Sequence, residues 1–141
     1  MKALESRRVI LHCSATTPSQ DVDVEWCRRI HVDERGWSDV GYHYFIKQDG
    51  TVEFGRPLDR AGAHTKGHNN SIGICYAGGL NEERKPADTM TSQQELAFFE
   101  LWHSLNTVFG PLSLHGHNEF ANKACPSFVV KSKYSFLNHT P

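Results

Sequence analysis

Short runs of apolar residues, each bounded by polar residues, predict a set of β-strands along the chain. Runs of this kind cover residues 8–12, 42–47, 52–54, 71–77 and 112–114. Their lengths suit strands rather than helices. Asp49 and Gly50 lie between the second and third runs, and this dipeptide is a strong signal for a β-hairpin. The pattern therefore predicts five strands, two of them joined by a tight turn.

The longest predicted helix follows Thr91, where apolar residues recur at helical spacing as far as Phe109. Thr91 and Gln94 match a capping box at its start. Gly110 and Pro111 follow the last periodic residue and supply the stop. These local signals predict both ends of one helix.

An earlier helix is predicted to run towards residue 35, with Asp21 or Asp23 as its N-cap. Trp26 and Ile30 are spaced so that they share its apolar face. Gly36 then supplies the end of this helix. We expect this face to cover part of the sheet.

A last helix is predicted where Pro126 follows Cys125, because proline is tolerated at the first position of a helix. Strands that alternate with helices indicate an α/β or α+β fold, in which helices cover a sheet with one antiparallel hairpin. The 141 residues suit one domain with a sizeable core. We therefore expect a single domain spanning residues 1–141.

Composition and charge narrow the class of protein. The formal net charge is -1, so the basic surface typical of a general nucleic-acid binder is not expected. No apolar run approaches the roughly 20 residues that cross a bilayer, and the polar stretch before Val9 lacks the features of a secretory signal. We therefore expect a cytoplasmic protein without membrane insertion, with its four cysteines reduced.

Nine histidines are the first hint of metal or proton chemistry. His12 ends the first predicted strand, and His117 and Cys125 flank a loop between a strand and a predicted helix. Imidazole and thiolate both bind zinc, and two histidines with one cysteine leave a tetrahedral position open for water. His115 competes with His117 as the second ligand, because on an extended segment the two side chains point the same way.

Three other side chains are candidates for the chemistry beside such an ion. The Tyr42 hydroxyl and the Lys123 ammonium are groups that stabilise a developing oxyanion, and Glu119 is a candidate general base. Each also has an ordinary interpretation, as a core aromatic, a solvated lysine and a surface carboxylate. Cys13, which follows His12 on the strand, is expected to face the opposite side as a small buried residue.

Four segments in order along the chain resemble the zinc-dependent N-acetylmuramoyl-L-alanine amidases, a family that includes phage lysozymes of the amidase type and the peptidoglycan recognition proteins. The segments are LHCSATTPSQ (11–20), GWSDVGYHYFIKQDGTVEFGRP (36–57), AHTKGHNNSIGICYAGG (63–79) and HNEFANKACPSF (117–128). The resemblance extends over residues 9–128. It implies an α/β fold with a central mixed β-sheet flanked by helices, in one catalytic domain.

The resemblance also implies roles for individual residues. His12, His117 and Cys125 match the three ligands of one zinc ion, and this register favours His117 over His115. Tyr42 and Lys123 match the catalytic tyrosine and lysine of the phage branch. His64 and Asn69 fall in the loop that lines the substrate cleft, which is shorter here than expected, so they are the candidate substrate-binding residues.

The implied substrate is peptidoglycan or a muropeptide, cut at the amide between N-acetylmuramic acid and L-alanine. The resemblance implies a monomeric phage-type endolysin that reaches the cell wall after release through a breached membrane. A cytoplasmic amidase that recycles soluble muropeptides is the alternative. A binding module without catalysis is disfavoured because Cys125 is present. A structural zinc domain needs a fourth ligand, for which His115 and Cys13 are the candidates.

Overall fold

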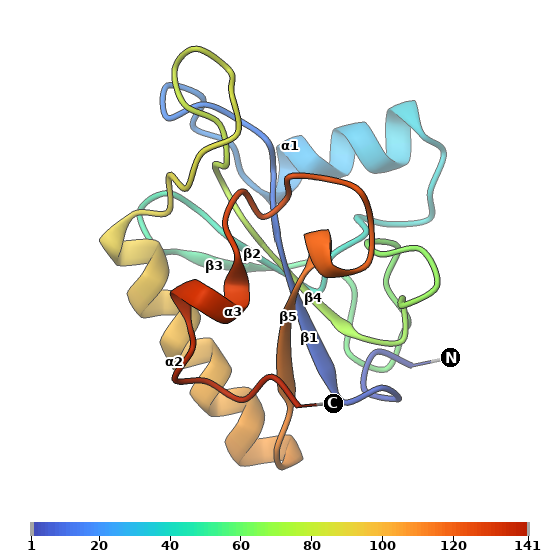
Figure 1. Cartoon of the computed structure of the whole chain (residues 1–141). Helices are drawn as coiled ribbons and strands as arrows, with labels where there is room; N and C mark the ends of the chain where they lie inside the picture. Colours follow the sequence, from blue (N-terminus) through green and yellow to red (C-terminus); the bar gives the residue numbers. More distant parts are fainter. Residues whose placement is uncertain (1, 141) are drawn as a thin grey trace.

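A five-stranded mixed sheet lies at the centre of the protein in this computed structural model, which describes residues 2–140 (Figure 1). The strand order across the sheet is β3-β2-β4-β1-β5. The strands are β1 (Arg8–Cys13), β2 (Tyr44–Ile46), β3 (Val52–Phe54), β4 (Ile72–Tyr76) and β5 (Ser113–Gly116). All five predicted strands are present, and the mixed α/β fold is confirmed.

The sheet is parallel except at one edge. β1 pairs in parallel with both β4 and β5, and β2 pairs in parallel with β4. Only β2 and β3 are antiparallel, and their hairpin closes where the Gly50 N–H donates to the Lys47 carbonyl at 2.9 Å. Gly50 has φ +90, a conformation that favours glycine, so the Asp-Gly signal is confirmed.

The two faces of β1 have different neighbours because side chains alternate along a strand. Val9, Leu11 and Cys13 belong to the larger apolar core, which packs against α2 (Ser92–Phe109) and includes Trp102 of that helix. His12 therefore points to the opposite face of the sheet. α2 lies along one face of the sheet in Figure 1, so the active-site candidates lie on the other.

The predicted capping box of α2 is present, and it also joins the helix to the sheet. The Thr91 hydroxyl accepts from the Gln94 N–H at 3.1 Å, and the Gln94 side-chain oxygen accepts from the Thr91 N–H at 2.9 Å. The Gln94 amide nitrogen then donates to the carbonyls of Ile46 and Ala77. This buried glutamine holds the start of α2 against the ends of β2 and β4.

The first helix, α1 (Val24–Arg28), continues as a π-helical segment, η1 (Arg29–Glu34). Asp23 is its N-cap, since its carboxylate accepts from the Trp26 N–H at 2.9 Å.

The expected apolar face of this helix is confirmed only in part: Trp26 is half-buried and packs against an apolar cluster that includes Val24 and Cys27, and Ile30 is half-buried outside that cluster. The buried positions are Val24, Cys27 and His31 instead. The wider helical turn of η1 and the pairing of His31 with the Gly41 N–H at 2.8 Å place a histidine in the core.

The prediction that a helix begins at Cys125 is also wrong. The chain makes a short 3-10 turn, η2 (His117–Glu119), and helix α3 begins only at Val130 and ends at Lys133. The Pro126 carbonyl accepts from the Tyr76 hydroxyl at 2.7 Å, so this segment makes tertiary rather than helical hydrogen bonds. Among residues 2–140, no helix combines the length and the apolar character needed to span a membrane.

Candidate active site

Three side chains from two distant parts of the sequence meet at the carboxyl end of β1. His12, His117 and Cys125 each offer one ligand atom, and these atoms all lie within 4.8 Å of one another. The His12 Nδ1 atom is 3.7 Å from the Cys125 Sγ atom. No other group of three or more metal-binding side chains is found in residues 2–140.

The η2 turn presents His117, and a carboxylate holds that turn in shape. The Glu119 Oε2 atom accepts from the Gly116 N–H at 2.7 Å, and its Oε1 atom accepts from the His115 ring at 3.0 Å. The Ser113 hydroxyl bonds the other ring nitrogen of His115 at 2.8 Å. His115 and Glu119 therefore support the turn that carries His117.

The positions of the two side chains favour His117 over His115 as the candidate ligand. Both ring nitrogens of His115 are occupied by Ser113 and Glu119, and its side chain does not join the three ligand atoms. Cys13 faces the α2 core as expected. Within residues 2–140 the cluster thus offers three protein ligands, which is the number that leaves one tetrahedral position open.

Burial controls the protonation of this cluster. It is the main cause that lowers the pKa of His12 well below its usual value, with His64 and His117 adding to the effect. It likewise lowers the pKa of His117, helped by the charge of Lys123. The neighbouring Cys13 thiol and burial raise the pKa of Cys125 in the absence of a cation. Neutral imidazoles are ready to bind a metal, and a cation would favour the Cys125 thiolate.

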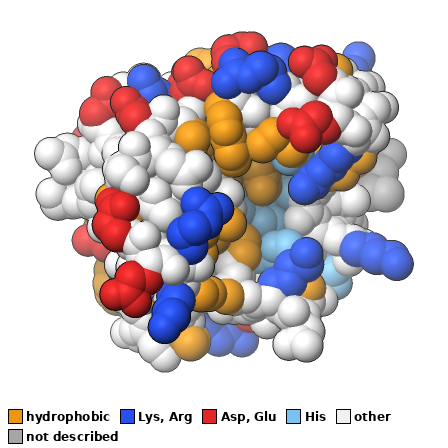
Figure 2. Space-filling view, turned by 90° about the horizontal axis from the view of Figure 1, so that it is seen from above, with side chains coloured by type: hydrophobic (Ala, Val, Ile, Leu, Met, Phe, Trp, Pro, Cys, Tyr) orange, Lys and Arg blue, Asp and Glu red, His pale blue; other side chains and the backbone are white. Residues whose placement is uncertain are grey.

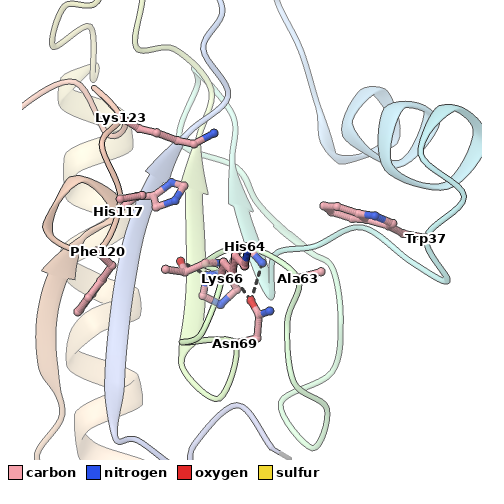
Figure 3. Close-up of a pocket in the computed structure, with 10 residues that line it drawn as sticks. Trp37, Ala63, His64, Lys66, Asn69, His117, Phe120 and Lys123 are labelled. Carbon is pink, nitrogen blue, oxygen red and sulfur yellow. Dashed lines mark hydrogen bonds between the residues drawn. The ribbon is translucent and has the colours of Figure 1, made fainter.

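Tyr42 and Lys123, the two residues matched to catalysis, line one cavity together with His117 and Cys125. The Tyr42 ring packs against His12, with 5.1 Å between ring centroids. Burial raises the pKa of the Tyr42 hydroxyl well above 10, so it remains a hydrogen-bond donor at neutral pH. Figure 3 shows the Lys123 side chain extending past His117, on the same side of the cleft.

The cleft consists of two adjoining cavities of about 500 Å³ and 330 Å³. Both are lined by Trp37, Ala63, His64, His117 and Lys123, so they form one continuous hollow. In the view of Figure 2, histidine side chains lie at the bottom of a hollow that hydrophobic and basic side chains surround. A substrate of several sugar or amino-acid units fits a groove of this size.

The loop that carries His64 and Asn69 forms part of the cleft wall (Figure 3). The Asn69 side-chain oxygen accepts from the N–H groups of His64 and Thr65 at 2.8 and 2.9 Å. His64 is only 9% exposed, and its Nδ1 atom is 2.9 Å from the Nε2 atom of His12. The structure thus places His64 behind a candidate metal ligand, and Asn69 holds the loop closed.

Two cleft residues were not identified from the sequence. Trp37 lines the cleft and packs against His31 with the two rings tilted and 4.6 Å between ring centroids. His31 also lies 5.6 Å from the Tyr42 ring, so it packs behind the candidate catalytic tyrosine. Trp37 follows Gly36 in a segment that carries the family resemblance, and this was the available signal. The sequence held no comparable signal for His31, because a histidine in a predicted helix is expected to lie on its polar face.

Comparisons with known proteins agree with this geometry. A family model described as N-acetylmuramoyl-L-alanine amidase matches residues 2–128. The endolysin of Escherichia phage T7 is 46% identical over 124 residues, covering 87% of this chain and 82% of the endolysin. The endolysin of Enterobacteria phage K11 is 42% identical over 131 residues, covering 92% of this chain and 86% of that protein.

Solved structures share the fold as well. The N-acetylmuramoyl-L-alanine amidase LysC from Clostridium intestinale URNW superimposes with a TM-score of 0.76 at 27% identity, over 92% of this chain and 85% of that chain. PGRP-SA of the bumblebee gives a TM-score of 0.80 at 26% identity, over 99% of this chain and 87% of that chain. Both similarities cover more than nine-tenths of this chain.

Proposed function

Because the chain belongs to the N-acetylmuramoyl-L-alanine amidase family and is a peptidoglycan amidase, we propose that it is a zinc-dependent enzyme of the endolysin type, acting through one catalytic domain. The bond cleaved joins the lactyl group of N-acetylmuramic acid to L-alanine of the stem peptide. The observation that carries the proposal is the convergence of His12, His117 and Cys125 in the cleft.

The donor set fits one zinc ion. Zn–N distances of about 2.0–2.1 Å and Zn–S distances of about 2.3 Å place tetrahedral ligand atoms roughly 3.5 Å apart. The 3.7 Å between His12 Nδ1 and Cys125 Sγ is close to that separation. When bound, Zn²⁺ supplies a Lewis acid that polarises the scissile carbonyl and lowers the pKa of water to about 7.

We assign the stabilisation of the developing oxyanion to Tyr42 and Lys123. Both side chains line the cavity that His117 and Cys125 also line, and the Tyr42 ring packs against His12. The buried Tyr42 hydroxyl keeps its proton because its pKa is raised, so it donates a hydrogen bond to the carbonyl oxygen as negative charge develops there. The Lys123 ammonium adds a positive charge at the same point, and such preorganised groups act mainly on the transition state.

The cleft wall supplies the substrate contacts in this proposal. Asn69 uses its side-chain oxygen within the loop, which leaves its amide nitrogen as the group for the substrate. His64 presents a ring edge rather than a nitrogen to the cleft, since both ring nitrogens lie at hydrogen-bond distance from protein atoms. The role of His64 in substrate contact stays a prediction.

The endolysin role follows from the relatives, which are phage endolysins. We propose that the protein acts as a monomer, is made in the cytoplasm and reaches peptidoglycan once another agent has opened the membrane. The same catalytic groups would serve a recycling amidase, so the size of the substrate is what separates the two roles.

The decisive experiment is digestion of purified sacculi and of soluble muropeptides, with the products identified by mass. Release of stem peptides with a free L-alanine amine from sacculi, abolished by a chelator and restored by Zn²⁺, is the expected result. Cleavage of soluble muropeptides alone would assign the recycling role. Activity that persists after complete removal of metal would overturn the zinc proposal.

A further inference from the structure

We propose that His64 is a positioning residue that fixes the tautomer of His12 and so keeps the His12 Nδ1 lone pair available to the metal. The inference rests on the proposed zinc site and assigns to His64 a role that does not require contact with substrate. It follows from a chain of hydrogen bonds that begins at the backbone carbonyl of Ser71 and ends at His12, one of the three candidate zinc ligands.

The first link fixes the proton on His64. Its Nε2 atom is 2.9 Å from the carbonyl oxygen of Ser71. A carbonyl only accepts hydrogen bonds, so Nε2 carries the proton that it donates. In a neutral imidazole the other nitrogen is then an acceptor, which makes the Nδ1 atom of His64 a lone pair directed at its neighbours.

The second link transfers this choice to His12. The His64 Nδ1 atom is 2.9 Å from the His12 Nε2 atom, and two nitrogen lone pairs at that distance would repel each other. His12 therefore holds its proton on Nε2 and donates it to His64. Its Nδ1 atom keeps a lone pair, and this is the atom that lies 3.7 Å from Cys125 Sγ.

Thr65 adapts to either neighbour. Its hydroxyl is 2.9 Å from His64 Nδ1 and 3.3 Å from His12 Nε2. A hydroxyl rotates to donate or accept, so Thr65 does not select a tautomer. The selection therefore comes from the Ser71 carbonyl, which cannot change its role.

The backbone at Gly62 and Gly73 restricts the position of the His64 ring. A Cβ atom on Gly62 would lie 2.3 Å from the His64 Cδ2 atom, and one on Gly73 would lie 2.6 Å from it. The two glycines thus form a slot into which the ring fits edge-on against the sheet. The Asn69 side-chain oxygen accepts from the His64 N–H at 2.8 Å, which fixes the backbone that carries the ring. Metal-binding histidines usually depend on such a partner for their orientation.

The first test is spectroscopic and needs no metal. In ¹⁵N-labelled wild-type protein without zinc, long-range ¹H–¹⁵N spectra should show the proton of His12 on Nε2. In His64→Leu this preference should be lost, giving a mixture of the two tautomers. A wild-type His12 that carries its proton on Nδ1 would overturn the proposal, whatever the behaviour of the variant.

The second test measures zinc affinity by competition with a chromogenic chelator. His64→Leu should bind zinc roughly 10–100-fold more weakly, the usual cost of losing a hydrogen-bond partner behind a ligand. His64→Asn, whose amide oxygen can accept the His12 proton, should recover part of that affinity. Equal zinc affinity in wild type and a folded His64→Leu would contradict the proposal.

His43→Asn is the matched control. His43 is also buried on this sheet, and its ring nitrogens bond the Gly73 N–H and the Arg60 carbonyl. The ring centroids of His43 and His64 are 5.8 Å apart, but His43 does not belong to the group of three candidate zinc ligands. It should bind zinc as wild type does. Absence of zinc binding in the wild type would instead refute the proposed zinc site, and the tautomer measurement would still decide the role of His64.

Discussion

The backbone N–H of Cys13 donates a hydrogen bond to the Sγ atom of Cys125, at 3.2 Å. This bond joins the end of β1 to the loop that follows η2, and it brings the sulfur next to His12. A donor directed at sulfur favours the thiolate over the thiol, which is the form that binds metals. The contact thus places the third candidate ligand, and it partly offsets the Cys13 thiol and the burial that raise the pKa of Cys125.

His12→Ala, His117→Ala and Cys125→Ala should each lose zinc and activity together. Each residue supplies one of the three ligand atoms in the cluster, and two protein ligands hold Zn²⁺ poorly. Zinc content after dialysis, measured beside amidase activity, checks this. A variant that kept one zinc per chain and full turnover would remove that residue from the ligand set.

Tyr42→Phe and Lys123→Ala should keep zinc and lose turnover. Removal of an oxyanion donor typically lowers kcat by about 10²–10³-fold. Steady-state kinetics on a defined muropeptide, with zinc content measured on the same samples, tests both residues. An unchanged kcat in either variant would return that side chain to a structural role.

Glu119→Ala should destabilise the fold by about 1–3 kcal/mol, because the Gly116 N–H and the His115 ring lose their shared acceptor. Zinc affinity should fall as well, since the η2 turn carries His117. Urea denaturation and chelator competition measure the two effects.

Lys131→Ala is the control for Glu119. Lys131 is exposed and lies 3.6 Å from the same carboxylate, and an exposed ion pair contributes little to stability. Its removal should change the free energy of unfolding by less than about 0.5 kcal/mol. A loss in Lys131→Ala as large as that in Glu119→Ala would show that the hydrogen bonds to the turn are not what matters.

Acid should destabilise the protein partly through His31. Burial, with smaller contributions from the charges of Arg35 and Arg56, lowers the pKa of His31 to about 4. Between pH 6.5 and 4 the unfolded chain therefore binds a proton that the folded chain does not, and stability falls as the pH falls. The loss attributable to this residue is on the order of 3 kcal/mol.

The test compares how the free energy of unfolding changes with pH in metal-free protein. His31→Asn should show a shallower loss between pH 6.5 and 4 than wild type, whatever its stability at neutral pH. His103→Asn, which replaces an exposed histidine of α2, should behave as wild type. Identical pH dependence in wild type and His31→Asn would rule out the contribution of His31.

Expression inside an intact bacterium should leave the cells whole, and a membrane permeabiliser should then cause lysis. The reason is the proposed endolysin role, in which peptidoglycan lies beyond the membrane and another agent opens the way to it. Culture turbidity before and after permeabilisation measures the effect, with Cys125→Ala as the control. Lysis before permeabilisation would reveal an export route.

Signals carried by neighbouring residues were read correctly from the sequence. The Asp49-Gly50 turn and the Thr91–Gln94 cap depend on backbone conformation within a few residues. The hairpin and the start of α2 could therefore be predicted from the sequence. Proline at position 126 was misread, because its segment bonds Tyr76 rather than forming a helix.

Contacts between distant residues could not be obtained in this way. His12 and His64 are separated by 52 positions, and nothing in either motif states that their rings touch. The burial of His31 depends likewise on the π-helical turn and on Gly41. The residues of the site could be named from the family resemblance, whereas their hydrogen bonds needed the fold.

The parallel pairing of β1 with β5 brings the first and last strands of the chain together. His12 and Cys125, which are 113 positions apart in sequence, would therefore be joined by a single ion. A link that closes a loop of this length reduces the freedom of the unfolded chain by an amount equivalent to about 4–5 kcal/mol in the cross-link model. The proposed zinc would thus stabilise the fold as a cross-link, in addition to its role in catalysis. The described cysteines are all free thiols, so no disulfide among them supplies such a cross-link.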